Sequence, residues 1–155
     1  MKIASHLDKF RRLDATLRKL DAGADQELWI WTAMNAGVNL LNAALHACSA
    51  TSETDSFHTQ VEGLYAVPER ATGVLRDAMH PPGDVMHVGQ PAIAAPLPPG
   101  IERASAALRV IEDLRERFVR GSERAPADVQ RDWHAAYATC VSELTAVLRA
   151  IEAVR

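Results

Sequence analysis

The residues best suited to chemistry lie in an irregular segment that holds His80, Asp84 and His87. Two imidazoles and a carboxylate are donors that a divalent transition metal takes up in proteins. His46, in the most apolar stretch of the chain, or His58 could add a further ligand. One reading is therefore a metal site of His46, His80, Asp84 and His87. In the structural alternative, Asp84 forms a turn after Pro-Pro-Gly, and a half-buried His87 bonds a backbone carbonyl.

A polar but uncharged stripe accompanies these candidates. Residues 28–52 contain no Asp, Glu, Lys or Arg. At helical spacing, Asn35, Asn39, Asn42 and His46 fall on one face, which we call the asparagine stripe. A solvated helix face normally carries Glu, Lys or Arg, because these are good helix formers and asparagine is not. We therefore expect protein to cover this stripe.

The covering element is predicted to be residues 80–100, which hold six of the eight prolines and three of the eight glycines. Neither a helix nor a central strand persists through such a sequence. A packed loop leaves backbone groups unpaired, at about 1 to 3 kcal/mol for each buried one. Asparagine side chains both donate and accept hydrogen bonds. We expect the asparagine stripe to bond the backbone of residues 84–90, so that the segment forms an ordered strap.

A functional version of the same arrangement is a polar pocket that holds a small ligand between stripe and strap. The residues predicted to line it come from both elements: Asn35, Asn39, Asn42, His46, Asp84 and His87. The only cofactor that the sequence suggests is a divalent metal ion.

Apolar residues recur at steps of three and four along most of the chain, which is typical of amphipathic helices. They predict long helices over about residues 3–22, 26–50, 101–120 and 127–154, a short helix over 69–79 and irregular chain over 80–100. The expected fold is all-α, a four-helix bundle in a single domain over 1–155. A long Pro/Gly-rich ordered crossover, with the short helix, joins the second and third long helices.

The second helix is predicted to be central, because two of its faces are apolar or small. Its inward seam is expected to be Trp31, Met34, Val38, Leu41, Leu45 and Cys48. The tryptophans Trp29, Trp31 and Trp133 are expected to be core and interface anchors; the alternative for Trp29, which lies off this seam, is a homodimer contact.

Composition excludes several function classes. The net charge is -3 and the sequence pI is about 6.1, with scattered arginines, so no basic surface for nucleic acid or an anionic membrane is expected. The uncharged run is long enough to span a bilayer, but three asparagines and a histidine on one face argue against it. The charged N-terminal residues have no signal-peptide pattern, and two cysteines do not suggest a disulfide framework. These features predict a cytoplasmic protein.

No Gly-rich phosphate loop or nucleophile elbow is present. The sequence therefore favours a non-catalytic interaction or small-ligand-binding module that forms a homodimer. The alternative is a metal-dependent enzyme with a His/Asp site between the central helix and the 80–100 segment.

Overall fold

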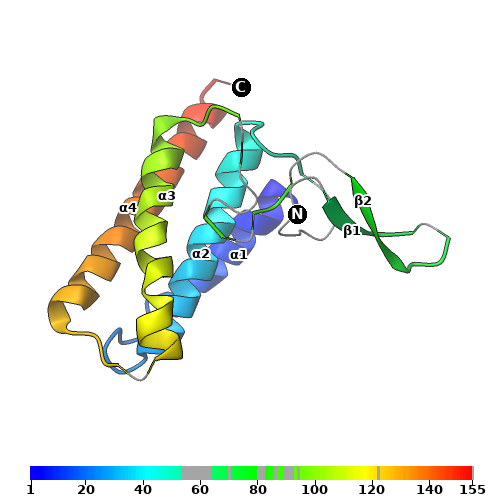
Figure 1. Ribbon diagram of the computed structural model, residues 1–155. Helices are drawn as coiled ribbons and strands as arrows, with labels where there is room; N and C mark the ends of the chain where they lie inside the picture. The colour runs from blue at the N-terminus through cyan, green and yellow to red at the C-terminus, as the bar shows by residue number, and fades with distance from the viewer. Residues whose placement is uncertain are drawn as a thin grey trace.

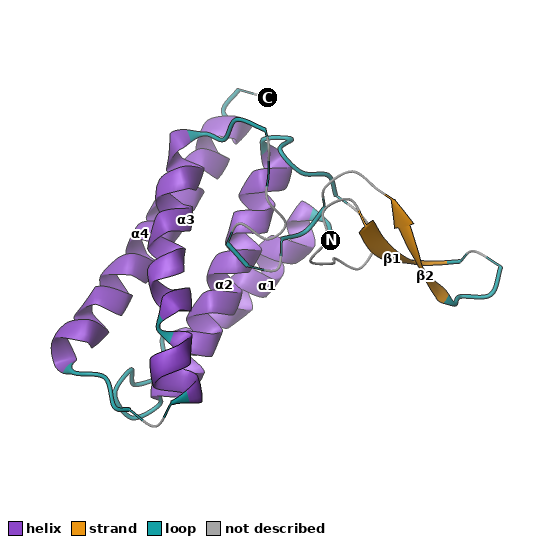
Figure 2. Cartoon of the chain, in the orientation of Figure 1, coloured by secondary structure: helices purple, strands orange, loops and turns teal. Residues whose placement is uncertain are grey.

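Four long helices form the protein in the computed structural model (Figures 1 and 2). The structure describes residues 1–53, 64–69, 71–79, 83–85, 87, 88, 93, 95–121 and 123–154. The helices are α1 (Ile3–Leu17), α2 (Gln26–Ala47), α3 (Pro99–Asp113) and α4 (Ala127–Glu152). The predicted all-α bundle is confirmed.

The largest differences from the predicted helix ends are in α1 and α3. α1 stops at Leu17 rather than near residue 22, because the amides of Lys19 and Leu20 bond back only three residues, to Thr16 O and Leu17 O. After α3 the chain makes one π-helical turn, η1 (Glu116–Arg120), which buries its phenylalanine. Pro99 occupies the start of α3, where its missing amide hydrogen is not needed.

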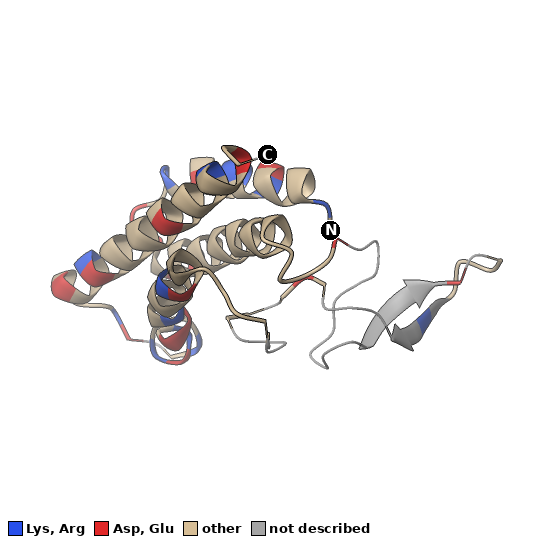
Figure 3. Ribbon diagram, turned by 90° about the horizontal axis from the view of Figure 1, so that it is seen from above, with Lys and Arg blue, Asp and Glu red and all other residues tan. Residues whose placement is uncertain are grey.

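α2 is the central helix and contacts α1, α3, α4 and η1. Small residues on α2 let the neighbouring helices approach it closely. At Gly37, for example, an added Cβ would lie 2.6 Å from Leu108 Cδ1 of α3. Side chains are buried on nearly every side of α2, so it forms the middle of the hydrophobic core. None of the described helices combines the length and apolar character that a membrane span requires. Acidic and basic residues are interspersed on the helices, and long stretches of helix carry neither (Figure 3).

Gly37 supports a testable prediction about this contact. Gly37→Val places a branched side chain against Leu108, so we expect the free energy of unfolding to fall by about 1 to 3 kcal/mol in urea denaturation. Ala106→Val on the exposed side of α3 is the control and should change it by about 0.5 kcal/mol or less. Adding Leu108→Ala to Gly37→Val should cost less than the sum of the two single changes. Strict additivity would contradict the contact.

The two tryptophans of α2 do not lie where the predicted inward seam places them. Trp29 is only 1% exposed and packs against Trp133, with ring centroids 5.8 Å apart, and against Tyr137. Trp31, expected to face inward, is 41% exposed, and Arg115 lies over its ring. The interpretation of Trp29 as a core anchor is therefore confirmed, and the alternative of a dimer contact is wrong. Because α2 is apolar or small around most of its circumference, spacing alone does not fix which side faces which neighbour.

The short helix predicted over 69–79 is also wrong. The chain forms an antiparallel hairpin of β1 (Leu64–Pro68) and β2 (Leu75–Met79), which projects from the bundle in Figure 1. Gly73 has a φ of 70°, a left-handed conformation that suits a turn and not a helix interior. Pro68, expected at a helix start, instead ends β1 opposite Leu75.

The described part of the crossover packs on the helices. Val85 and Val88 are buried in the hydrophobic core, and Ile93 and Leu97 pack partly buried against it. Residues 80–82, 86, 89–92 and 94 lie outside the described residues, so only part of the predicted ordered strap is described.

The two cysteines are free and differ in environment. Cys140 is fully buried, and burial raises the pKa of its thiol to about 12, whereas Cys48 is partly exposed. Because the thiolate is the reactive form, we expect iodoacetamide at pH 8 to modify Cys48 well before Cys140 in the folded protein. Peptide mass spectrometry over time measures this, with urea-unfolded protein as the control in which both react. Equal rates in the folded protein would contradict the burial of Cys140.

Candidate metal site

Three buried side chains from distant parts of the chain meet at one point. They are His6 on α1, His46 near the end of α2 and Asp84 in the crossover, and they are 1%, 6% and 6% exposed. Nε2 of His46 lies 2.9 Å from Oδ1 of Asp84, and Nε2 of His6 lies 3.1 Å from the same oxygen. One ligand atom from each residue lies within 4.8 Å of the other two. This is a compact set of two imidazoles and a carboxylate.

The helix pairing explains how the two histidines meet. α1 and α2 pack together and are joined by residues 18–25, so the beginning of α1 lies beside the end of α2 (Figure 1). The His6 and His46 rings are 5.4 Å apart. Asp84 reaches them from the described part of the crossover.

Asn42 holds the chain beside Asp84. Its Nδ2 donates to the carbonyl oxygen of Val85 at 2.9 Å, and the Val85 amide donates back to Asn42 Oδ1 at 2.7 Å. Asn42 is 2% exposed, so both bonds are shielded from water. One side chain therefore pairs both backbone groups of the residue that follows Asp84 and fixes where the carboxylate lies.

Each histidine has a second partner on its other ring nitrogen. Nδ1 of His6 lies 3.0 Å from Oδ1 of Asn39, and Nδ1 of His46 lies 2.7 Å from Oγ1 of Thr51. Asn39 and Thr51 are both buried. Such outer contacts fix the plane of an imidazole and are typical of metal-binding histidines.

The electrostatics of the cluster favour an ionised Asp84. Burial raises the pKa of this carboxyl. Hydrogen bonds from His46, His6 and the α-amino group of Met1 together lower it by more than burial raises it, so the pKa lies well below its usual range. The Met1 ammonium donates to Oδ1 at 2.7 Å and to Oδ2 at 2.8 Å. The carboxylate is therefore available as a ligand without first losing a proton, although a bound cation would share it with this ammonium group.

The structure brings together only part of the predicted ligand set. His46 and Asp84 lie in the cluster. His87 does not: it is half-buried, and its Nδ1 lies 3.4 Å from Oε1 of Glu112. His80 and His58 lie outside the described residues.

The residues of the asparagine stripe have different roles. Asn42 bonds the strap backbone as expected, while Asn39 is buried against His6. The expectation is wrong for Asn35, which is exposed and donates to Trp31 O within its own helix. It is also wrong for His46 as far as the described residues go, because both of its ring nitrogens lie against side chains, those of Thr51 and Asp84.

Sequence reasoning missed His6. Its signal is positional: it follows Ile3 by three residues and precedes Phe10 by four, which places it on the inward face of α1. A histidine on the buried face of an otherwise charged helix needs a polar partner. The identity of that partner depends on the pairing of α1 with α2.

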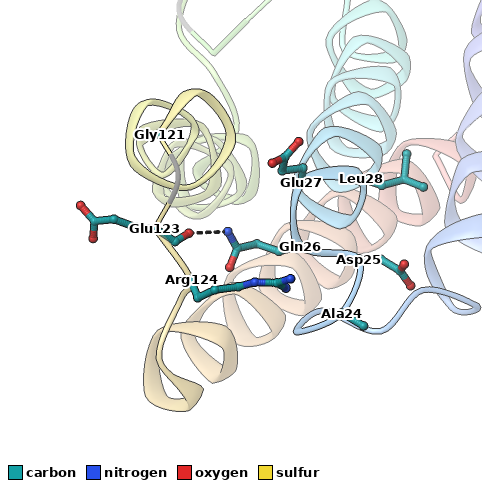
Figure 4. A pocket seen from close by; sticks show the side chains of 8 residues that line it. All are labelled: Ala24, Asp25, Gln26, Glu27, Leu28, Gly121, Glu123 and Arg124. Carbon is teal, nitrogen blue, oxygen red and sulfur yellow. Dashed lines mark hydrogen bonds between the residues drawn. The ribbon is translucent and has the colours of Figure 1, made fainter.

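A surface pocket lies at the N-terminal end of α2, at the opposite end of this helix from His46 (Figure 4). Its buried polar group is Gln26. The side-chain Nε2 of Gln26 donates to Phe118 O at 2.9 Å and to Glu123 O at 2.8 Å. Oε1 of Gln26 accepts from the Ala125 amide at 2.7 Å. These bonds use both the donor and the acceptor of the amide, so Gln26 serves to fasten the segment after η1 to α2.

No family model, curated protein or solved structure matches this chain. The geometry of the His6, His46 and Asp84 cluster is therefore the basis for a proposal of function.

Proposed function

We propose that this protein binds a divalent first-row transition-metal ion between His6, His46 and Asp84. The convergence of their three ligand atoms within 4.8 Å, in a buried place, carries the proposal. Ligand atoms about 2.0 to 2.2 Å from a tetrahedral zinc ion lie roughly 3.3 to 3.6 Å apart. The distances of 2.9 and 3.1 Å to Asp84 Oδ1 thus need to widen by roughly 0.2 to 0.7 Å. Two imidazole nitrogens favour zinc, cobalt or iron over magnesium and calcium, which take oxygen ligands.

This proposal combines the two alternatives that the sequence raises. A metal ion with three protein ligands keeps at least one coordination position for water or another small molecule. The ion would then anchor a small ligand between α2 and the crossover. The donor set supports a binding role and does not name a reaction.

Metal titration tests the proposal. The EDTA-treated protein should take up one equivalent of Zn²⁺ in calorimetry, and the stoichiometry should be matched by elemental analysis after dialysis. His46→Ala and Asp84→Asn each remove a ligand and should weaken binding by more than about 100-fold, since loss of outer contacts alone costs about 10- to 100-fold.

The matched control is His87→Ala, which changes a crossover histidine outside the cluster and should keep wild-type affinity. Circular dichroism confirms that each variant is folded. An absence of stoichiometric Zn²⁺ binding by the wild-type protein would overturn the proposal, and so would equal losses in His46→Ala and His87→Ala.

We also propose that the protein forms a homodimer through the exposed side of α2. Leu28 and Trp31 lie three residues apart on this helix and are 54% and 41% exposed. Large apolar side chains that share one exposed face are typical of an interaction surface. Light scattering should give twice the chain mass of 16.9 kDa for the wild-type protein and the chain mass for Leu28→Glu. Val154→Glu, at an exposed valine near the C-terminal end, is the control.

A further inference from the structure

The orientation of one buried amide determines how His6 meets the proposed metal. Asn39 is 5% exposed, and its Nδ2 donates to the carbonyl oxygen of Asn35 at 2.7 Å. This bond turns the amide so that Oδ1, and not the NH₂ group, faces Nδ1 of His6 at 3.0 Å. Because a carbonyl oxygen only accepts hydrogen bonds, Nδ1 of His6 carries a hydrogen.

The other nitrogen of His6, Nε2, then faces the site and is the one that meets a bound metal. In a neutral imidazole with hydrogen on Nδ1, Nε2 is the acceptor and therefore the atom that a metal binds. Nε2 of His6 lies 3.1 Å from Asp84 Oδ1 and donates a hydrogen to it when no metal is bound. A metal ion that binds both atoms takes the place of this hydrogen, while Nδ1 keeps its own hydrogen toward Asn39.

We infer that Asn39 is a positioning residue that holds His6 in its metal-binding tautomer. The inference rests on the proposed metal binding and adds a specific role: the Asn39 carbonyl selects the nitrogen of His6 that meets the metal. Neutral outer acceptors on ligating histidines fix the tautomer and the ring plane. The three polar side chains that end the asparagine stripe thus act on one site, since Asn42 places Asp84, Asn39 orients His6 and His46 is itself a ligand.

Three variants separate the acceptor from the rest of the Asn39 side chain. Asn39→Leu removes the acceptor at similar volume and should weaken Zn²⁺ binding by about 10- to 100-fold. Asn39→Asp keeps an oxygen toward His6 Nδ1 and should bind within a few-fold of the wild type, or more tightly. Both changes lose the bond to Asn35 O, so a difference between them isolates the acceptor. Asn35→Ala, on the exposed part of the stripe, is the matched control and should leave the affinity unchanged.

A spectroscopic measurement detects a change that a purely structural role would not produce. Nitrogen-15 NMR of the Zn²⁺-loaded wild-type protein should show the His6 hydrogen on Nδ1 and the metal on Nε2, and Asn39→Asp should show the same. In Asn39→Leu, the Co²⁺ absorption spectrum should differ in intensity from that of the wild type. Should Asn39→Leu fail to fold, Asn39→Ala provides the same comparison.

The two proposals fail in different ways. A wild-type protein that takes up no Zn²⁺ overturns the metal site itself. If the wild type binds Zn²⁺ and the folded Asn39→Leu variant binds equally well, the metal site stands and the positioning role of Asn39 is overturned. Equal weakening in Asn39→Leu and Asn39→Asp also overturns it, because the acceptor is then not what matters.

Discussion

Alanine in place of Asp84 is expected to lower the free energy of unfolding at pH 7 by about 3 to 5 kcal/mol, the usual result of removing one partner from a buried ionic cluster. The change removes the shared acceptor of His6, His46 and the Met1 ammonium, all of which bond Asp84 within 3.1 Å. It also leaves buried ring nitrogens without that partner. Urea denaturation followed by tryptophan fluorescence measures the loss.

The size of this effect should depend on pH in a defined direction. The pKa of Asp84 is lowered in the folded protein, so the unfolded chain binds more protons in acid and stability falls as the pH falls. The contribution is present above the unfolded pKa of about 3.9 and is lost as the pH drops toward the folded value. The difference between the wild type and Asp84→Ala should therefore shrink below about pH 4.

Asp8→Ala is the control for both measurements. Asp8 forms an exposed pair with Arg12 on α1, at 3.1 Å, and such pairs contribute about 0 to 1 kcal/mol. An Asp84→Ala variant no less stable than Asp8→Ala would contradict the account of the cluster. A difference that grows on acidification would contradict the sign of the pKa shift.

Trp133→Ala should have an effect of similar size, about 3 to 5 kcal/mol, through the core and not through charge. Trp133 is fully buried between Trp29 and Phe118, with ring centroids 5.8 and 5.7 Å away. Its removal leaves a large cavity at the contact of α4 with α2 and η1. The melting temperature and the urea midpoint should both fall strongly.

Two further variants show whether the lost ring volume is the cause. Nε1 of Trp133 has no hydrogen-bond partner within the described part of the chain, so Trp133→Phe removes an unpaired N–H along with one ring and should cost less than Trp133→Ala. Trp31→Ala, at a 41% exposed tryptophan, should cost about 1 kcal/mol or less. Similar losses in Trp133→Ala and Trp31→Ala would contradict the packing described above.

The helices follow from the sequence because amphipathic spacing is a local property. The three-and-four pattern of α1, α3 and α4 places their apolar faces without knowledge of the rest of the chain. α2 lacks a charged face, so its existence is predictable but its rotation is not, and Trp31, expected on the inward seam, is exposed while Trp29, off this seam, is buried. The β1–β2 hairpin is stabilised by pairing between segments, which the spacing within Leu75–Met79 does not reveal.

The candidate site was predictable to the extent that its residues stand out in sequence. Asp84 and His46 are polar groups in apolar surroundings and therefore attract attention. The spacing of His6 places it on the inward face of α1, but only the antiparallel pairing with α2 shows which side chains it meets there. His87 sits three residues from Asp84 yet lies by Glu112, because an irregular chain has no fixed side-chain period.

The wide separation of the ligands along the chain has a consequence for how the protein matures. His6 and Asp84 are 78 positions apart and His46 and Asp84 are 38 apart, so a chain whose crossover has not yet docked offers no complete set of donors. The metal ion would then bind last and would stabilise only the folded protein. At a free metal concentration of 100 times the dissociation constant, this stabilisation is about 2.7 kcal/mol. Binding of a metal ion at the proposed site would thereby raise the resistance of the protein to proteolysis.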